Sequence, residues 1–125
     1  MPHLKLRGSM RPDDVKQAIT TDVQRWGRIV LKIETSWLRA DGLALLVEGV
    51  VVEHSRPLHP VAIVGLDEFQ TVIRLWPIVN VERTPATQRW LAWIAAKLQQ
   101  EGAGPVDVTN IDSALFDGLG LQLGG

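Results

Sequence analysis

The chain contains no cysteine, and this absence removes several kinds of site at once. Without thiols the protein has no disulfide bridge, no thiolate zinc centre and no cysteine nucleophile. A cysteine-free sequence fits a reducing compartment, so we expect a cytoplasmic location. A glycine-rich phosphate loop and a Gly-x-Ser-x-Gly nucleophile motif are missing as well, and we predict no cofactor.

Long apolar runs and an excess of one charge are also missing. The longest apolar run, residues 43–52, is interrupted by Glu48 and falls short of the ~20 residues that span a bilayer. The first residues lack the apolar core of a signal peptide, and we expect no membrane partner. A formal net charge of −1 gives no electrostatic argument for nucleic acid, which we do not expect as a partner.

What remains is the composition of one folded domain. Hydrophobic residues make up 46% of the chain and charged residues 22%, as in globular rather than disordered proteins. The residues before Met10 look like a cloning-site leader. We therefore set residues 1–9 apart as a vector-derived or disordered leader, while their being native stays open, and assign residues 10–125 to a single α+β domain.

Two segments have the spacing of helices. In residues 12–26, apolar side chains recur every three or four positions from Val15 to Trp26, and a glycine follows. Residues 85–101 begin after an N-cap threonine and end before a glycine. We predict that the two helices pack through their apolar positions on one face of a sheet.

Residues 28–76 between these helices have the pattern of three or four strands separated by short breaks. Breaks this short join antiparallel strands, because a parallel crossover needs a dozen or more residues. The predicted fold class is therefore α+β: an N-terminal helix, an antiparallel β-meander of about four strands, and a C-terminal helix with a short irregular or β tail. Residues 61–66 are apolar at nearly every position, which is typical of a strand covered on both faces, by a helix and by a second copy.

Alternation along the strands is not regular. In residues 43–52 the two halves place their apolar side chains on opposite parities. A β-bulge at Gly49 would reconcile them and keep Glu48 and Glu53 outward, whereas without it Glu48 would point inward and be desolvated. In the preceding strand, alternation places Trp37 on the same side as the core residues, so we expect its side chain to face the core.

Five tryptophans without any tyrosine are unusual and support the functional hypothesis. Indole combines a large apolar area with one hydrogen-bond donor, which suits both a core and a binding surface. We predict a non-enzymatic binding or assembly protein that acts through an apolar, tryptophan-rich surface as a homodimer, with a protein or an apolar small molecule as a further partner. The candidate ligand-binding or interface residues are Trp37, Trp76, Trp90, Trp93 and Glu48.

The alternative is a small enzyme or small-molecule-binding protein. Its pocket would lie between the sheet and the helices and would use Glu48, His54 or His59. A hairpin closed by the loop at residues 55–58 would place the two imidazoles opposite each other. A zinc site needs at least three protein ligands, and the spacing indicates no third, so we predict no metal site and assign no catalytic residue.

Overall fold

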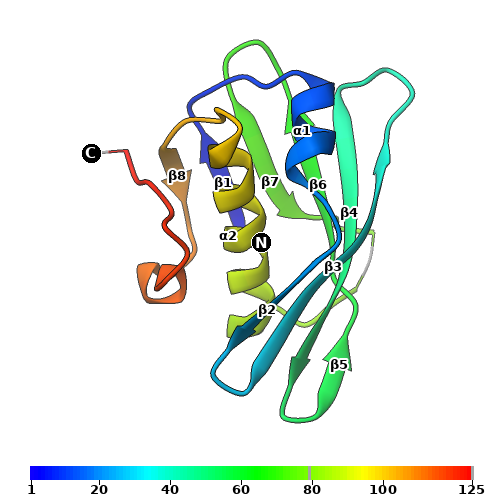
Figure 1. The fold of residues 1–125 in the computed structure, drawn as a ribbon, viewed down its shortest axis with the longest axis vertical. Helices are drawn as coiled ribbons and strands as arrows, with labels where there is room; N and C mark the ends of the chain where they lie inside the picture. The colour runs from blue at the N-terminus through cyan, green and yellow to red at the C-terminus, as the bar shows by residue number, and fades with distance from the viewer. Residues whose placement is uncertain (79, 125) are drawn as a thin grey trace.

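The computed structural model describes residues 1–78 and 80–124, which form one antiparallel sheet with two helices packed on the same side of it (Figure 1). The strand order is β2-β3-β4-β6-β7-β1-β8, and β5 pairs with β4 alone. The strands are β1 (His3–Leu6), β2 (Asp22–Trp26), β3 (Ile29–Leu38), β4 (Ala44–Glu53), β5 (Arg56–Leu58), β6 (Val61–Leu66), β7 (Thr71–Leu75) and β8 (Val106–Thr109). The helices are α1 (Pro12–Ala18) and α2 (Pro85–Gln100), and a 3-10 turn, η1 (Ser113–Phe116), follows β8.

The predicted fold class is wrong. The chain starts with a strand rather than a helix, and the sheet has eight strands rather than a meander of about four. The antiparallel pairing expected from the short connections is present in every strand pair between β2 and β7. The predicted meander corresponds to β3, β4, β6 and β7. The sheet continues beyond it with β2 on one side and with β1 and β8 on the other.

The segment left outside the predicted domain supplies β1. This strand lies between β7 and β8, and Leu4 and Leu6 are fully buried in the core. Gly8 extends the contact, since its N–H donates to the carbonyl oxygen of Ala103 at 2.8 Å. Without β1 the β8 strand would have no partner in the sheet, so residues 3–6 are part of this fold, whatever their origin.

The predicted helix over residues 12–26 is also wrong in its second half. Helix α1 ends at Ala18, and β2 pairs with β3 in its place. Thr21 donates its hydroxyl to the carbonyl oxygen of Glu34, and Asp22 accepts from the N–H of Val23 through its own side chain. Such local side-chain bonds compete with helical ones, and a β-branched run disfavours the helix further.

The bulge predicted at Gly49 of β4 is absent, and a bulge that the sequence did not indicate lies in β3. Pairing between β3 and β4 shifts by one residue between Ile33 and Thr35, which leaves Glu34 as the extra residue. Strand β4 itself alternates regularly, with Leu45, Val47, Gly49 and Val51 on the helix side. Consequently Glu48 lies on the side away from the helices, whereas Glu53 lies on the helix side, opposite to its predicted orientation.

Helix α2 is the centre of the core. Thr84 caps it through a hydrogen bond from the N–H of Thr87 at 3.2 Å, and Pro85 occupies the first helical position, as the sequence predicts. Its buried side chains include Trp90, Leu91, Ile94 and Leu98, all with no exposed surface. The helix is buried almost all round because η1 and the C-terminal tail pack on its side away from the sheet.

Candidate functional site

One face of the sheet carries no helix within the described residues (Figure 1). Directly opposed residues of antiparallel neighbours point to the same side, so the run of pairs from Trp37 through Leu46 and Ile63 to Arg74 identifies this face. We call this surface the open face. Its apolar members include Val23, Val30, Trp37, Leu46, Val50, Val52, Val61, Ile63, Val72, Trp76 and Val108.

The bulge in β3 places Trp37 on the open face. Simple alternation from Leu31 and Ile33, which are buried under the helices, would turn Trp37 toward the core. The extra residue Glu34 reverses the parity, and Trp37 pairs with Leu46 instead. Its side chain is left 61% exposed, a large fraction for an indole.

Trp37 and Trp76 flank a hollow of about 290 Å³ on the open face. The floor of this hollow is small and aliphatic, formed by Ala44, Leu46 and Ile63. Gly65 lies beside Ala44 in the next strand, and a Cβ there would meet nothing nearer than the oxygen of Val72 at 4.0 Å. The two indoles therefore leave room for one apolar side chain or ring between them.

Glu48 lies among apolar neighbours of the open face, opposite Thr35 in β3 and Val61 in β6. The N–H of the Trp37 indole donates to its Oε2 at 2.6 Å. This bond fixes the indole and leaves the second carboxylate oxygen available to a donor from outside. Trp37, Trp76 and Glu48, three of the predicted site residues, therefore share one surface.

Cations surround the apolar part of the open face. The strand register places Lys5, Arg25, Lys32 and Arg74 on this side. Among the described residues none of these four forms an ion pair; the lysines and arginines that do are Arg7, Arg39, Arg56 and Lys97. The open face is thus apolar in its middle, carries one hydrogen-bonded carboxylate, and has four cationic groups.

The other two predicted site residues belong to the core. Trp90 has no exposed surface, and its indole N–H donates to the carbonyl oxygen of Lys32 at 2.9 Å. Trp93 is 6% exposed and lies under the ammonium group of Lys97, 5.2 Å from the ring centre. Neither indole reaches the open face, so both act through packing.

The two histidines are not set opposite each other. Strand β5 pairs Arg56 with Glu53, so His54 and Ser55 form a two-residue turn, and His59 follows β5. Glu48 belongs to the open face, and the space expected for a pocket between sheet and helices is filled by core side chains. Within residues 1–78 and 80–124 no three histidine or carboxylate side chains are placed to hold a metal ion.

Arg89 is a buried charge that the sequence pattern did not single out. It is 3% exposed, stacks on Trp26 at 4.4 Å and donates to the carbonyl oxygens of Leu115 and Asp117 at 3.0 and 2.6 Å. Burial lowers the pKa of Arg89, and the nearby Asp117 carboxylate partly opposes this. These contacts fasten η1 to α2, and the signal in the sequence is an arginine at a core position next to Trp90.

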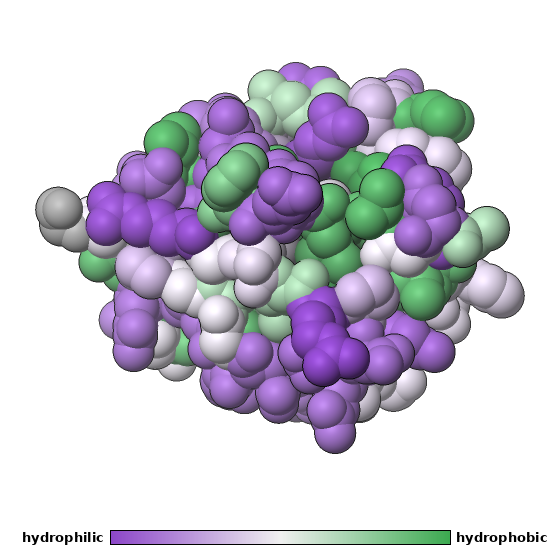
Figure 2. All heavy atoms as spheres, turned by 90° about the horizontal axis from the view of Figure 1, so that it is seen from above, coloured by the Kyte–Doolittle hydropathy of each residue, from purple (hydrophilic) through white to green (hydrophobic). Residues whose placement is uncertain are grey.

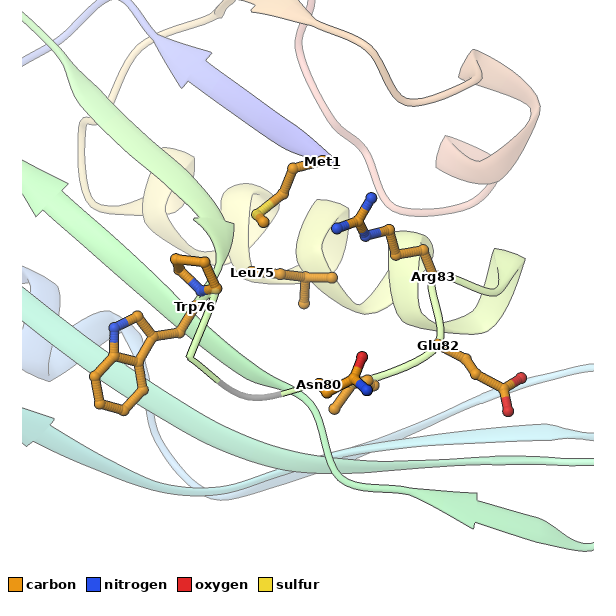
Figure 3. A pocket seen from close by; sticks show the side chains of 8 residues that line it. Met1, Leu75, Trp76, Asn80, Glu82 and Arg83 are labelled. Carbon is orange, nitrogen blue, oxygen red and sulfur yellow. The ribbon is translucent and has the colours of Figure 1, made fainter.

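A hollow of about 430 Å³ lies where β7 ends, close to the first residue of the chain (Figure 3). The guanidinium group of Arg83 extends toward Met1, the Met1 side chain runs toward Leu75, and the indole of Trp76 points away. The carboxylate of Glu82 binds Arg56 instead of facing this hollow. Its lining therefore supplies one guanidinium group and no acid–base pair.

A further hollow of about 470 Å³ lies at the opposite end of the sheet, between the start of α1 and two turns. Figure 2 looks onto this end and shows apolar residues gathered right of centre among hydrophilic ones. Asp67 at its rim accepts from the N–H groups of Phe69 and Gln70, and these bonds lower the pKa of Asp67. That carboxylate thus holds its own turn, and the hollow offers mainly apolar contact.

Comparison with known proteins identifies no relative. No protein-family model matches the chain, and neither a curated protein nor a solved structure matches it. Among the described residues, no helix is both long and apolar enough to cross a membrane. The geometry of the surfaces is therefore the basis for assigning a function.

Proposed function

We propose that this protein is a non-enzymatic binding and assembly protein whose open face binds a second copy of the chain. The observation that supports this proposal is the exposed Trp37 beside an apolar hollow on a sheet face without a helix. Exposed aromatic residues next to a pocket are the usual energetic centres of protein interfaces. In a twofold contact, one copy would insert an apolar side chain between the two indoles of the other.

The size of the open face fits a dimer. Its main part spans four strands, β3, β4, β6 and β7, spaced about 4.8 Å apart, and roughly eight residues at about 3.3 Å each. The projected area is therefore on the order of 500 Å², and side chains add to the accessible area. Stable protein interfaces bury about 800 Å² on each partner, so a dimer contact would include the rim of the open face as well.

Glu48 gives two such faces a local point of charge complementarity, which acts against the repulsion between the four cations that each face carries. Closing the contact would remove Glu48 from water, and a buried carboxylate needs donors beyond the single bond from Trp37. Lys32 and Arg74 lie on the same face without an ion-pair partner of their own in the described structure. A second copy can therefore offer its cations to Glu48, which favours self-association over an uncharged apolar partner.

Sedimentation equilibrium and light scattering at micromolar concentration test the proposal. We expect a mass near twice 13.8 kDa for the unmodified protein. Trp37→Ala should weaken the dimer by about 30-fold or more, the effect of losing one central aromatic anchor. The matched control is Phe69→Ala, because Phe69 is 80% exposed but lies in the β6–β7 turn. A monomeric unmodified protein, or equal effects of the two substitutions, would reject the proposal.

A further inference from the structure

The hairpin turn between β4 and β5 has an uncommon backbone. His54 has φ 53° and Ser55 has φ 61°, so both central residues adopt the left-handed conformation of a type I′ turn. Asparagine and glycine are the residues that normally occupy these positions, because glycine has no Cβ and the short polar side chain of asparagine tolerates the left-handed conformation better than other side chains. Strained residues that persist in a fold often belong to a functional site, and the surroundings of this turn support that.

Glu53 immediately precedes the turn and points to the helix side of the sheet. Its side chain is 19% exposed, and its Oε2 is buried without a hydrogen-bond partner among the described residues. The imidazole Nε2 of His54 lies 3.7 Å from the other oxygen, Oε1. Oε2 has almost no accessible surface, so a bound molecule would have to use the other oxygen, Oε1, which also receives no hydrogen bond from the described residues. A partly buried carboxylate without a donor is unfavourable, so Oε1 is an acceptor for a bound molecule.

The space next to Glu53 is large enough for such a molecule. A hollow of about 490 Å³ lies between the β2–β3 turn, the β4–β5 turn and the start of α2. Ligand sites in proteins have volumes of about 300–1,000 Å³. Apolar wall is supplied by Trp26, Ile29 and Pro85, and the polar groups come from Glu53, His54 and Arg28. We call this space the Glu53 hollow.

We propose that the Glu53 hollow binds a small organic cation: a primary ammonium group on an apolar, ring-sized body. The ammonium group would donate to Oε1 of Glu53, and the body would lie against Trp26 and Ile29. Charge-assisted bonds to a carboxylate in a partly buried site are stronger than those from a neutral donor. Arg28 also lines the hollow but forms no ion pair with Glu53 in the described structure, and its charge disfavours a ligand with two ammonium groups.

This site is independent of the proposed dimer. Glu53 has the parity of Val47 and Val51, which face the helices, whereas the open face carries the opposite parity of β4. Binding of an amine should therefore survive the Trp37→Ala substitution that weakens the dimer. Failure of one proposal leaves the other standing, because each is measured on a different side of the sheet.

Titration of ¹⁵N-labelled protein with 2-phenylethylammonium, followed by NMR, tests the inference. We expect saturable shifts of the Trp26 indole N–H and of the backbone amides of residues 53–55. The neutral isostere 2-phenylethanol, measured on the unmodified protein, should bind at least about tenfold more weakly. The same loss is expected for Glu53→Gln, whereas Glu34→Gln, which removes an exposed carboxylate of β3, should bind normally.

Three outcomes would overturn the inference. Equal binding of the alcohol and the amine would show that the carboxylate is not used. Full amine binding by Glu53→Gln would place the ligand elsewhere. Absence of any saturable shift at millimolar amine would mean that the Glu53 carboxylate is satisfied by water alone. The comparison of amine with alcohol needs no variant, so it decides the matter even if Glu53→Gln does not fold.

Discussion

Replacing Gly49 with alanine tests the contact that accompanies the β3 bulge and thereby the open face. A Cβ at Gly49 would lie 2.3 Å from the backbone oxygen of Lys32 and 2.6 Å from Nε1 of Trp90. The indole occupies this space because its N–H donates to the same Lys32 oxygen at 2.9 Å. Alanine therefore forces either β3 or Trp90 to move, and the hydrogen bond is lost or lengthened.

The expected cost of Gly49→Ala combines three effects. A buried donor and acceptor left without each other cost about 1–3 kcal/mol. Overpacking of a filled core site adds about 1–3 kcal/mol. Replacing a strand glycine stabilises by about 0.5–1 kcal/mol, because alanine loses less conformational entropy on folding. We therefore expect the free energy of unfolding to fall by about 1–5 kcal/mol, a large part of the roughly 5–15 kcal/mol typical of a domain.

Urea unfolding followed by tryptophan fluorescence measures this change, and Gly65→Ala is the matched control. Gly65 is a strand glycine like Gly49, but its added Cβ would meet only the oxygen of Val72, at 4.0 Å. The control should leave the free energy of unfolding unchanged or raise it by up to about 1 kcal/mol. Equal effects of the two substitutions would refute the steric argument and the role given to Trp90.

Three further predictions concern the core, the strained turn and acid stability. Ile94→Ala removes a fully buried side chain from α2 and should lower the free energy of unfolding by about 2–5 kcal/mol in urea; an unchanged midpoint would contradict the described packing. Replacing His54-Ser55 with Asn-Gly should raise stability by about 1 kcal/mol, seen as a higher Tm in calorimetry, because these residues tolerate φ values of 53° and 61°; a lower Tm would argue against strain. The hydrogen bond from Lys97 lowers the pKa of Asp22 from its ordinary value, so this carboxylate stabilises the fold above about pH 4 and loses that effect as the pH falls through its folded pKa. The Asp22 side chain is 46% exposed, which limits the effect to less than about 1 kcal/mol, and Asp22→Asn should flatten the acid limb of a stability–pH profile.

The sequence predicts helix α2 well and helix α1 poorly, for a physical reason. Around α2 the cap, the proline and the apolar spacing all agree, and the helix runs over Pro85–Gln100. In residues 12–26 the apolar spacing continues through β2, because Val23 and Trp26 lie at helical intervals from Ile19 by coincidence. Val23 is 53% exposed in β2, so the helical spacing of the apolar residues there does not correspond to a buried helix face.

The side of the sheet to which the residues of β3 and β4 point cannot be predicted from alternation alone. The change of apolar parity within residues 43–52 is visible in the sequence, but a bulge at Gly49 is the wrong explanation, because β4 alternates regularly and carries apolar side chains on both faces. The bulge that does exist adds Glu34 to β3, where the sequence gives no sign of it. Gly49 is needed for another reason, the close approach of Trp90 across the strand. The orientations of Glu48, Glu53 and Trp37 all depend on the position of the bulge.

Strand β1 lies in the residues that look like a leader, and its pattern is too short to predict a strand by itself. Only two apolar residues, Leu4 and Leu6, alternate there, and both are fully buried between β7 and β8. A four-residue pattern carries little information, and its pairing depends on strands distant in the chain. The same holds for β8, which is held by β1 on one side and by the tail through Gln122 and Gly124 on the other.

The covered and the open sides of the sheet are connected through the bulge. Trp90, a predicted interface residue that lies in the core, binds the Lys32 oxygen just before the extra residue Glu34. Beyond Glu34 the parity of β3 is reversed, and this reversal brings Trp37 beside Glu48 on the open face. Trp90, which lies over Gly49, thus helps to hold the β3 backbone that presents Trp37 on the other side of the sheet. A binding surface of this kind leaves no motif in the sequence, because it depends on a register shift and not on residue spacing.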